Sequence, residues 1–264
     1  VVVRTMPPVM RRGAPDEIGS ARTLTNRKSA LTWLTTEPKQ TKLFEIPQPD
    51  ITPKVTDNST GANNRQVAVR IQLPAFSAPT LWGVLPNGTV AVSNDLNYQL
   101  QFARNGKIAR TIQRPITARK VTEADKNREK ARRREQMSRG GGGMVFATTT
   151  RDGNGPERSS RSIGGTLPKA EIDRMLAELT FNEYMPVLAG MYADPRGRLW
   201  VQRTGREIGT DGPIDLIAAN GQYIGTLVGQ KLPAAVSPTG RAAYIERADM
   251  DVEKVVVKKL PANW

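Results

Sequence analysis

The sequence predicts an all-β protein built from four-stranded antiparallel sheets, with a basic and partly helical insertion between them. Two observations lead to this prediction. A Pro-x-Gly turn followed by a short apolar run occurs three times in the 264-residue chain, and such self-similarity is typical of repeat architectures. Between the repeats, one stretch loses its apolar runs and carries arginine, lysine and glycine instead.

The repeats begin with Pro86-Asn87-Gly88, Pro195-Arg196-Gly197 and Pro238-Thr239-Gly240. Asn-Gly pairs at 105–106 and 220–221 predict tight hairpins, because both central residues of a type I′ turn need positive φ. The strands predicted around the first turn are 81–85, 89–93, 98–104 and 108–113. Those predicted around the second are 187–193, 199–203, 213–219 and 223–228.

The third repeat is shorter, with strands predicted over 241–246 and 252–260 and a turn over 248–251. Earlier apolar runs at 30–36, 42–47 and 66–73 predict a further, less regular sheet. We expect residues 1–5 to form a strand that completes the last sheet, because an unpaired sheet edge invites pairing with another chain.

Four-stranded meanders of about 40 residues are the units of β-propellers. One small sheet cannot bury both faces, whereas neighbouring sheets packed around an axis can. The sequence therefore predicts a propeller-like array of blades in one domain. Its N-terminal blades span residues 1–115, a basic insertion of helix and Gly-rich chain spans 116–186, and C-terminal blades span 187–264.

Four segments carry a family resemblance: YADPRGRLWVQR (192–203), PIDLIAANGQYIGTL (213–227), LWGVLPNGTVAVSNDLNYQLQFARNGKI (81–108) and AAYIERADMDVEKVVVKKL (242–260). They resemble the six-bladed, NHL-like β-propeller proteins of soil and aquatic bacteria. The resemblance covers most of the chain from about residue 27 and implies a propeller fold. Since the chain has room for about four such units, we expect an incomplete propeller.

The insertion holds much of the excess positive charge. Residues 116–166 contain 12 Lys plus Arg and 6 Asp plus Glu, a net of +6 out of +14 for the chain. A helix is predicted over 121–137, with Thr122 as N-cap and Asp125 completing a capping box. This helix lacks an apolar stripe, so it needs solvent or a charged partner.

The rest of the insertion is of two kinds. Glycines 140–143 predict a flexible joint and 151–165 a linker, so no strand is expected between 115 and 186. A second helix is predicted over 169–181, and its apolar stripe should dock on a core. The stripe consists of Ile172, Met175, Leu176 and Leu179.

Composition excludes much catalytic chemistry. The chain has no His and no Cys, so serine triads with a His base, His-paired cysteine nucleophiles and the common zinc sites are ruled out. Asp249, Asp251 and Glu253 alternate like calcium ligands, but the other ligands of a calcium loop are missing and a hairpin turn is favoured. Trp82 and Trp200 are expected at corresponding strand positions, packing between blades. We expect no catalysis, no cofactor and no metal.

Arg128, Arg132, Arg133 and Arg134 cluster on the helix that has no core to serve, and we expect them to contact a partner. The predicted function is a non-catalytic scaffold, an accessory structural subunit of a larger membrane-associated complex. Because the resembling family occurs in bacteria that include phototrophs, a photosynthetic reaction centre with its light-harvesting assembly is the complex we would name. Other protein subunits are the expected partners, and anionic lipid headgroups also fit the basic charge.

No apolar stretch reaches the roughly 18 residues of a membrane span. The chain begins with Val1, and we expect a processed protein that is peripheral to the membrane in the periplasm. Two alternatives stay open. A pI near 10.3 also suits nucleic-acid phosphates, as in a ribosome-bound protein, although only 5% of residues are aromatic. The third is a ligand-binding or hydrolytic propeller that uses its central channel.

Overall fold

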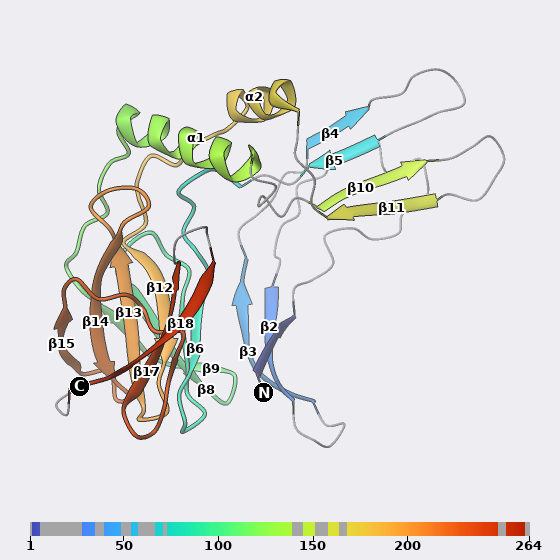
Figure 1. The fold of residues 1–264 in the computed structure, drawn as a ribbon. Helices are drawn as coiled ribbons and strands as arrows, with labels where there is room; N and C mark the ends of the chain where they lie inside the picture. Colours follow the sequence, from blue (N-terminus) through green and yellow to red (C-terminus); the bar gives the residue numbers. More distant parts are fainter. Residues whose placement is uncertain are drawn as a thin grey trace.

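The computed structural model describes residues 2–5, 28–34, 40–48, 54–57, 67–70, 73–138, 145–150, 158–163, 168–247 and 252–261. These residues form a β-rich fold of antiparallel sheets with two helices, α1 (Glu123–Ser138) and α2 (Lys169–Ala177) (Figure 1). The prediction of antiparallel sheets with a partly helical insertion is confirmed.

Two four-stranded sheets follow the first two repeats, each with its strands in chain order. The first contains β6 (Leu81–Val84), β7 (Val90–Ser93), β8 (Gln99–Arg104) and β9 (Lys107–Gln113). The second contains β12 (Leu188–Ala193), β13 (Arg198–Thr204), β14 (Asp211–Ala218) and β15 (Tyr223–Leu227). All eight strands predicted for these repeats are confirmed.

The three Pro-x-Gly turns share one backbone geometry. Their glycines, Gly88, Gly197 and Gly240, have φ of 79°, 82° and 77°, a region that side chains disfavour. In each turn the residue before proline donates its N–H to the carbonyl four residues later and accepts the glycine N–H. The repeat seen in the sequence is therefore a structural repeat.

Two further sheets flank this pair, each with three described strands. One contains β1 (Val2–Thr5), β2 (Lys28–Leu34) and β3 (Gln40–Pro47). The other contains β16 (Ala235–Val236), β17 (Arg241–Arg247) and β18 (Glu253–Lys259). The prediction that residues 1–5 complete the last sheet is wrong, because β1 pairs with β2. The predicted turn at 248–251 lies outside the described residues.

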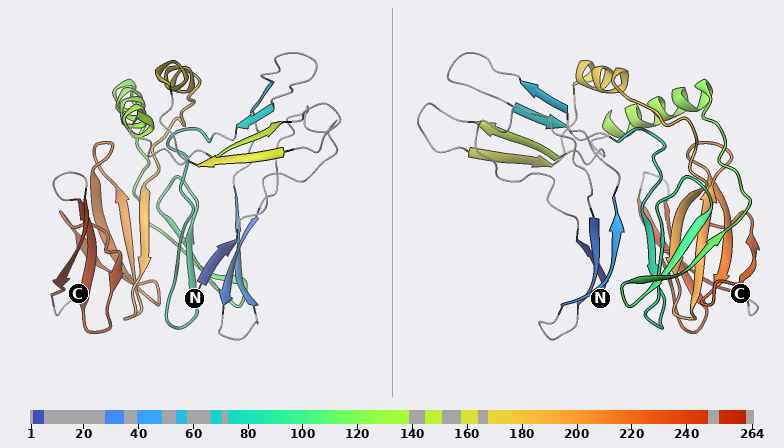
Figure 2. Two further views of the ribbon diagram at one scale, coloured as in Figure 1. Left: turned by 45° about the vertical axis from the view of Figure 1, so that its right-hand side comes forward. Right: turned by 180° about the vertical axis from the view of Figure 1, so that it is seen from behind.

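Two hairpins lie side by side, apart from these sheets (Figures 1 and 2). They are β4 (Lys54–Asp57) with β5 (Val67–Arg70), and β10 (Val145–Thr150) with β11 (Arg158–Ile163). The run at 66–73 was expected beside 30–36 and 42–47, and no strand was expected in the insertion, so both predictions are wrong. The valine and threonines of β10 favour a strand even though glycine-rich sequence lies on either side of the hairpin. Glycines 140–143 lie outside the described residues.

Apolar clusters fill the space between consecutive sheets. Alternate residues of one strand enter different clusters, since neighbouring side chains of a strand point to opposite faces. On β13, Leu199 and Val201 face the first four-stranded sheet, while Trp200 faces the β16–β18 sheet. On β7, Val90 and Val92 face the β1–β3 sheet. Neighbouring sheets therefore cover both faces of the two four-stranded sheets at their inner strands, while the outer strands β9 and β15 keep exposed residues.

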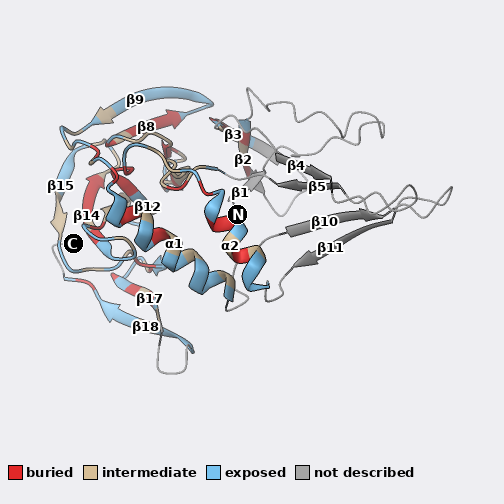
Figure 3. Cartoon of the chain, turned by 90° about the horizontal axis from the view of Figure 1, so that it is seen from above, coloured by how far each residue is buried: buried red, intermediate tan, exposed pale blue. Residues whose placement is uncertain are grey.

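The sheets are arranged around one side of α1. Seen from above, the outer strands β9, β15 and β18 follow one another along the outside, and α1 lies on the inner side of this arc (Figure 3). Strands β6 and β12 of adjacent sheets come close, so that a Cβ added at Gly83 would lie 3.1 Å from the Ala193 Cβ. The two four-stranded sheets thus approach each other through their first strands, whereas the β1–β3 sheet approaches β7 and β8 through β3.

The two tryptophans pack between sheets, as predicted, but not at corresponding positions. Trp82 lies on β6, the first strand of its sheet, whereas Trp200 lies on β13, the second strand of its sheet. Trp82 packs in the cluster shared with the β1–β3 sheet, and Trp200 packs in the cluster shared with the β16–β18 sheet. Both strands contain Leu-Trp, but in the first repeat this pair precedes the Pro-x-Gly turn and in the second repeat it follows the turn.

Candidate partner-binding site

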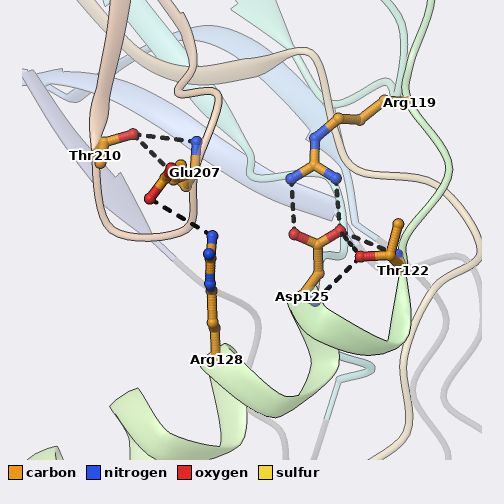
Figure 4. A network of polar contacts seen from close by, with 6 residues as sticks. All are labelled: Arg119, Thr122, Asp125, Arg128, Glu207 and Thr210. Atoms are coloured by element: carbon orange, nitrogen blue, oxygen red, sulfur yellow. Dashed lines mark hydrogen bonds and ion pairs between the residues drawn. The ribbon is translucent and has the colours of Figure 1, made fainter.

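The first turn of α1 is fixed by the predicted capping box (Figure 4). The Asp125 N–H donates to Thr122 Oγ1 at 3.2 Å, and the Thr122 N–H donates to Asp125 Oδ2 at 3.0 Å. Arg119 also donates two hydrogen bonds to the Asp125 carboxylate, at 2.6 and 2.9 Å. The hydrogen bond from Arg119 is the main cause that lowers the pKa of Asp125 below its ordinary range.

One turn later, a second buried carboxylate holds two of the four predicted arginines. Arg132 donates two hydrogen bonds to Glu129 at 2.8 Å each, and Arg133 donates one at 2.7 Å. Burial raises the pKa of Glu129, but the hydrogen bonds from both arginines outweigh burial, so the pKa lies below its ordinary value.

The other two arginines tie α1 to its surroundings. Arg128 forms an ion pair with Glu207, in the loop between β13 and β14, at 3.5 Å (Figure 4). Arg134 forms one with Asp173 of α2 at 2.8 Å. The charged partner that this helix needs is thus supplied by the same chain. More than half of each of these two arginine side chains stays exposed, and their role as partner contacts remains a prediction.

The second helix docks as predicted. Its apolar stripe is buried, although the helix ends at Ala177 and not at residue 181. Leu179 lies beyond the helix but is buried with the stripe. Lys126 and Lys130 of α1 lie 6.0 and 5.8 Å from the ring centre of Phe181, a distance at which a cation is attracted to an aromatic face. An ion pair therefore joins α1 to α2, and cation–π contacts join α1 to Phe181, which follows α2.

Two adjoining clefts of about 200 and 370 Å³ lie where the chain enters α1, beside the loop between β13 and β14. They share Arg119, Met185, Thr204 and Gly205. Their lining is mostly apolar, and the larger cleft also contains Glu129 together with Arg132 and Arg133, which pair with it. The described part of the chain contains no cluster of three or more potential acidic metal ligands.

Two buried aspartates join sheets and turns. Asp215 on β14 is fully buried and lies 2.6 Å from Arg114 Nη1, which belongs to the segment after β9. Asp194 accepts hydrogen bonds from the Trp200 indole at 3.0 Å and from the Arg198 side chain at 2.8 Å. Sequence reasoning missed both. A signal for Asp215 was a lone acid within the apolar strand PIDLIA.

The last sheet presents an uncovered apolar face. The pairs Ile245↔Val255 and Ala243↔Val257 are direct cross-strand neighbours, and such neighbours point to the same face of a sheet. Ile245, Val255 and Val257 are 55%, 70% and 59% exposed. The opposite face packs Ala242 and Tyr244 against the second four-stranded sheet. No described residue covers the outward face. Sequence reasoning missed this surface, because alternation along β18 does not say which face a neighbouring sheet covers.

No protein-family model matches the sequence, and a search of curated proteins finds no match. Of the described helices, neither combines the length and apolar character that crossing a membrane requires.

Acid should loosen α1. Asp125 and Glu129 have pKa values lowered from ordinary values of 3.8 and 4.5. They therefore add stability that is present above pH 4.5 and is lost as pH falls through their folded-state pKa values. We expect Asp125→Asn to lower the free energy of unfolding at pH 7 by about 2 kcal/mol, and by much less at pH 2. Urea unfolding at both pH values measures this difference.

Glu123→Gln is the matched control for this experiment. Glu123 lies on the same turn of α1 and pairs with Lys126, but its side chain is 80% exposed. Such pairs contribute little, so the stability at pH 7 should change by less than about 0.5 kcal/mol. Equal losses for the two variants would show that the buried carboxylate does not anchor α1.

Proposed function

We propose that the protein is a non-catalytic scaffold, an accessory subunit of a larger membrane-associated assembly. The observation that carries this proposal is the outward face of the last sheet, where Ile245, Val255 and Val257 are all more than half exposed. Contiguous exposed apolar patches rimmed by polar residues are typical of interaction sites. The interior sheets support it, because each is held on both faces and gives a rigid base.

We also propose that the sheets form an incomplete propeller. Their stacking in chain order, the approach of β6 to β12 and the placement of β9, β15 and β18 on the outside support this arrangement. The two end sheets of the array differ in what they expose. The last sheet exposes apolar side chains, whereas the β1–β3 sheet carries the exposed side chains of Lys28, Lys42 and Glu45 in two ion pairs.

The basic charge supports a membrane-associated partner. A net charge of +14 attracts the molecule to anionic lipid or acidic protein surfaces. A periplasmic location and a photosynthetic reaction centre with its light-harvesting assembly remain part of the proposal, and rest on the sequence.

Isolation from native membranes in mild detergent tests this function. We expect the protein to migrate with membrane subunits in a fixed ratio at low salt. A free monomer at both low and high salt would contradict the scaffold proposal. An association that nuclease removes would contradict it as well, and would favour the nucleic-acid alternative, for which affinity falls steeply with salt.

A further inference from the structure

The uncovered face of the last sheet continues the stacking that holds the rest of the molecule together. Strand β17 points Ala242 and Tyr244 into the cluster that contains Trp200 and Ile214. Its alternate residues, Ala243 and Ile245, point the other way. The centre of this outward face is apolar like the covered faces, although it stands at the end of the array. Arg241 and Lys259 lie at one end of the face, and Arg247 and Glu253 lie at the other.

We propose that this face binds a partner protein through an apolar β-sheet face bordered by carboxylates, stacked on the last sheet as the sheets stack on one another. The inference rests on the scaffold function proposed above and names the partner's contact surface. Branched aliphatic side chains of the partner would cover Val255, Val257 and Ile245. Both of the last sheet's faces would then be buried, like those of the inner strands of the two four-stranded sheets.

The charges around the face define the border of the partner's surface. Arg241 and Lys259 are direct cross-strand neighbours at one end of the same face. Both residues are exposed, and no described acidic side chain pairs with either of them. Carboxylates on the partner at this end would form charge-assisted hydrogen bonds with the two cations. An acidic rim therefore fits this end, and a basic rim would be repelled.

A second copy of this chain fits less well. Each copy carries a net charge of +14, and large like charges keep proteins apart. A head-to-tail contact would place the apolar face against the outer face of the β1–β3 sheet, where Lys28 and Glu45 form an ion pair. A face-to-face pair would match the two apolar centres, but it would bring two chains of net charge +14 together. A head-to-tail pair would place the apolar centre against charged side chains.

Binding to membranes that lack the protein tests the inference. The protein is purified in mild detergent, labelled with a fluorophore and added at low salt to membranes from cells that lack it. We expect the double variant Val255→Gln/Val257→Gln to lose at least about tenfold in affinity, since buried apolar anchors dominate binding at interfaces. Ile108→Gln on β9 is the matched control, because Ile108 is also half exposed, and it should bind like the wild type.

A photo-cross-linking residue at position 255 identifies what covers the face. We expect a cross-linked peptide from another protein, with alternating apolar residues and nearby Asp or Glu. Cross-links to a second copy, to lipid or to nucleic acid would overturn the inference.

The two proposals fail differently. If wild-type protein does not bind to these membranes, the scaffold function fails. If the wild type binds and the Val255→Gln/Val257→Gln variant binds equally well, only the inference about this face fails. Thermal unfolding of each variant checks that the sheets remain folded.

Discussion

Replacing Asp215 by alanine is expected to lower the free energy of unfolding by about 3 kcal/mol, because removing one partner of a buried ion pair leaves an uncompensated charge. The carboxylate is fully buried between the two four-stranded sheets, 2.6 Å from Arg114 Nη1 and 3.4 Å from Arg203 Nε. About a quarter of each arginine side chain is exposed. Water can therefore solvate them in part, which places the loss near the lower end of the usual range.

Urea unfolding at pH 7 measures this loss, and Asp173→Ala is its control. Asp173 also pairs with an arginine, but its side chain is 44% exposed, so the control should lose less than about 1 kcal/mol. A second readout comes from Tyr98, whose pKa is raised first by burial and next by the charge of Asp215. In Asp215→Ala the phenol should ionise at lower pH in an absorbance titration. Unchanged stability and ionisation would show that Asp215 does not link the sheets.

Replacing Trp200 by alanine is expected to cost about 3–5 kcal/mol, the usual range for deleting a large buried aromatic side chain. Trp200 is fully buried in the cluster that joins the second four-stranded sheet to the last sheet. Its indole N–H also donates to Asp194 Oδ2 at 3.0 Å. The variant would leave a cavity beneath the last sheet and remove one donor from a buried carboxylate.

Amide hydrogen exchange locates this effect. We expect exchange in β17 and β18 to accelerate more than exchange in β7, because β7 packs on the other side of the array. Trp200→Phe keeps most of the apolar contact but loses the indole N–H, and it should cost about 1–2 kcal/mol. Uniform acceleration across all strands would contradict the view that Trp200 chiefly holds the last sheet.

Local signals made the two four-stranded sheets predictable. Asn105 and Gly106 have φ of 53° and 76°, as the Asn-Gly hairpin signal requires. The capping box of Thr122 and Asp125 likewise acts over three residues. Each of these features depends on neighbours in the chain, so the sequence pattern carries it directly.

The features that were missed depend on contacts between distant segments. Residues 2–5 form a strand of only four residues that could pair with many sheet edges, and only the folded chain places it beside β2. Arg128 and Arg134 are neutralised by Glu207 and Asp173, which lie 79 and 39 positions further along the chain. The uncovered face of the last sheet could not be predicted for the same reason, since exposure depends on which sheets become neighbours.

Amide hydrogen exchange of the isolated protein compared with the membrane-bound protein tests the central claim most directly. The scaffold account predicts slower exchange in β17 and β18 when the protein is bound, with β9 unchanged. Protection confined to α1 would instead assign binding to the exposed Arg128 and Arg134. Protection in neither element, with the protein demonstrably bound, would contradict the account of the last sheet as the partner's docking surface.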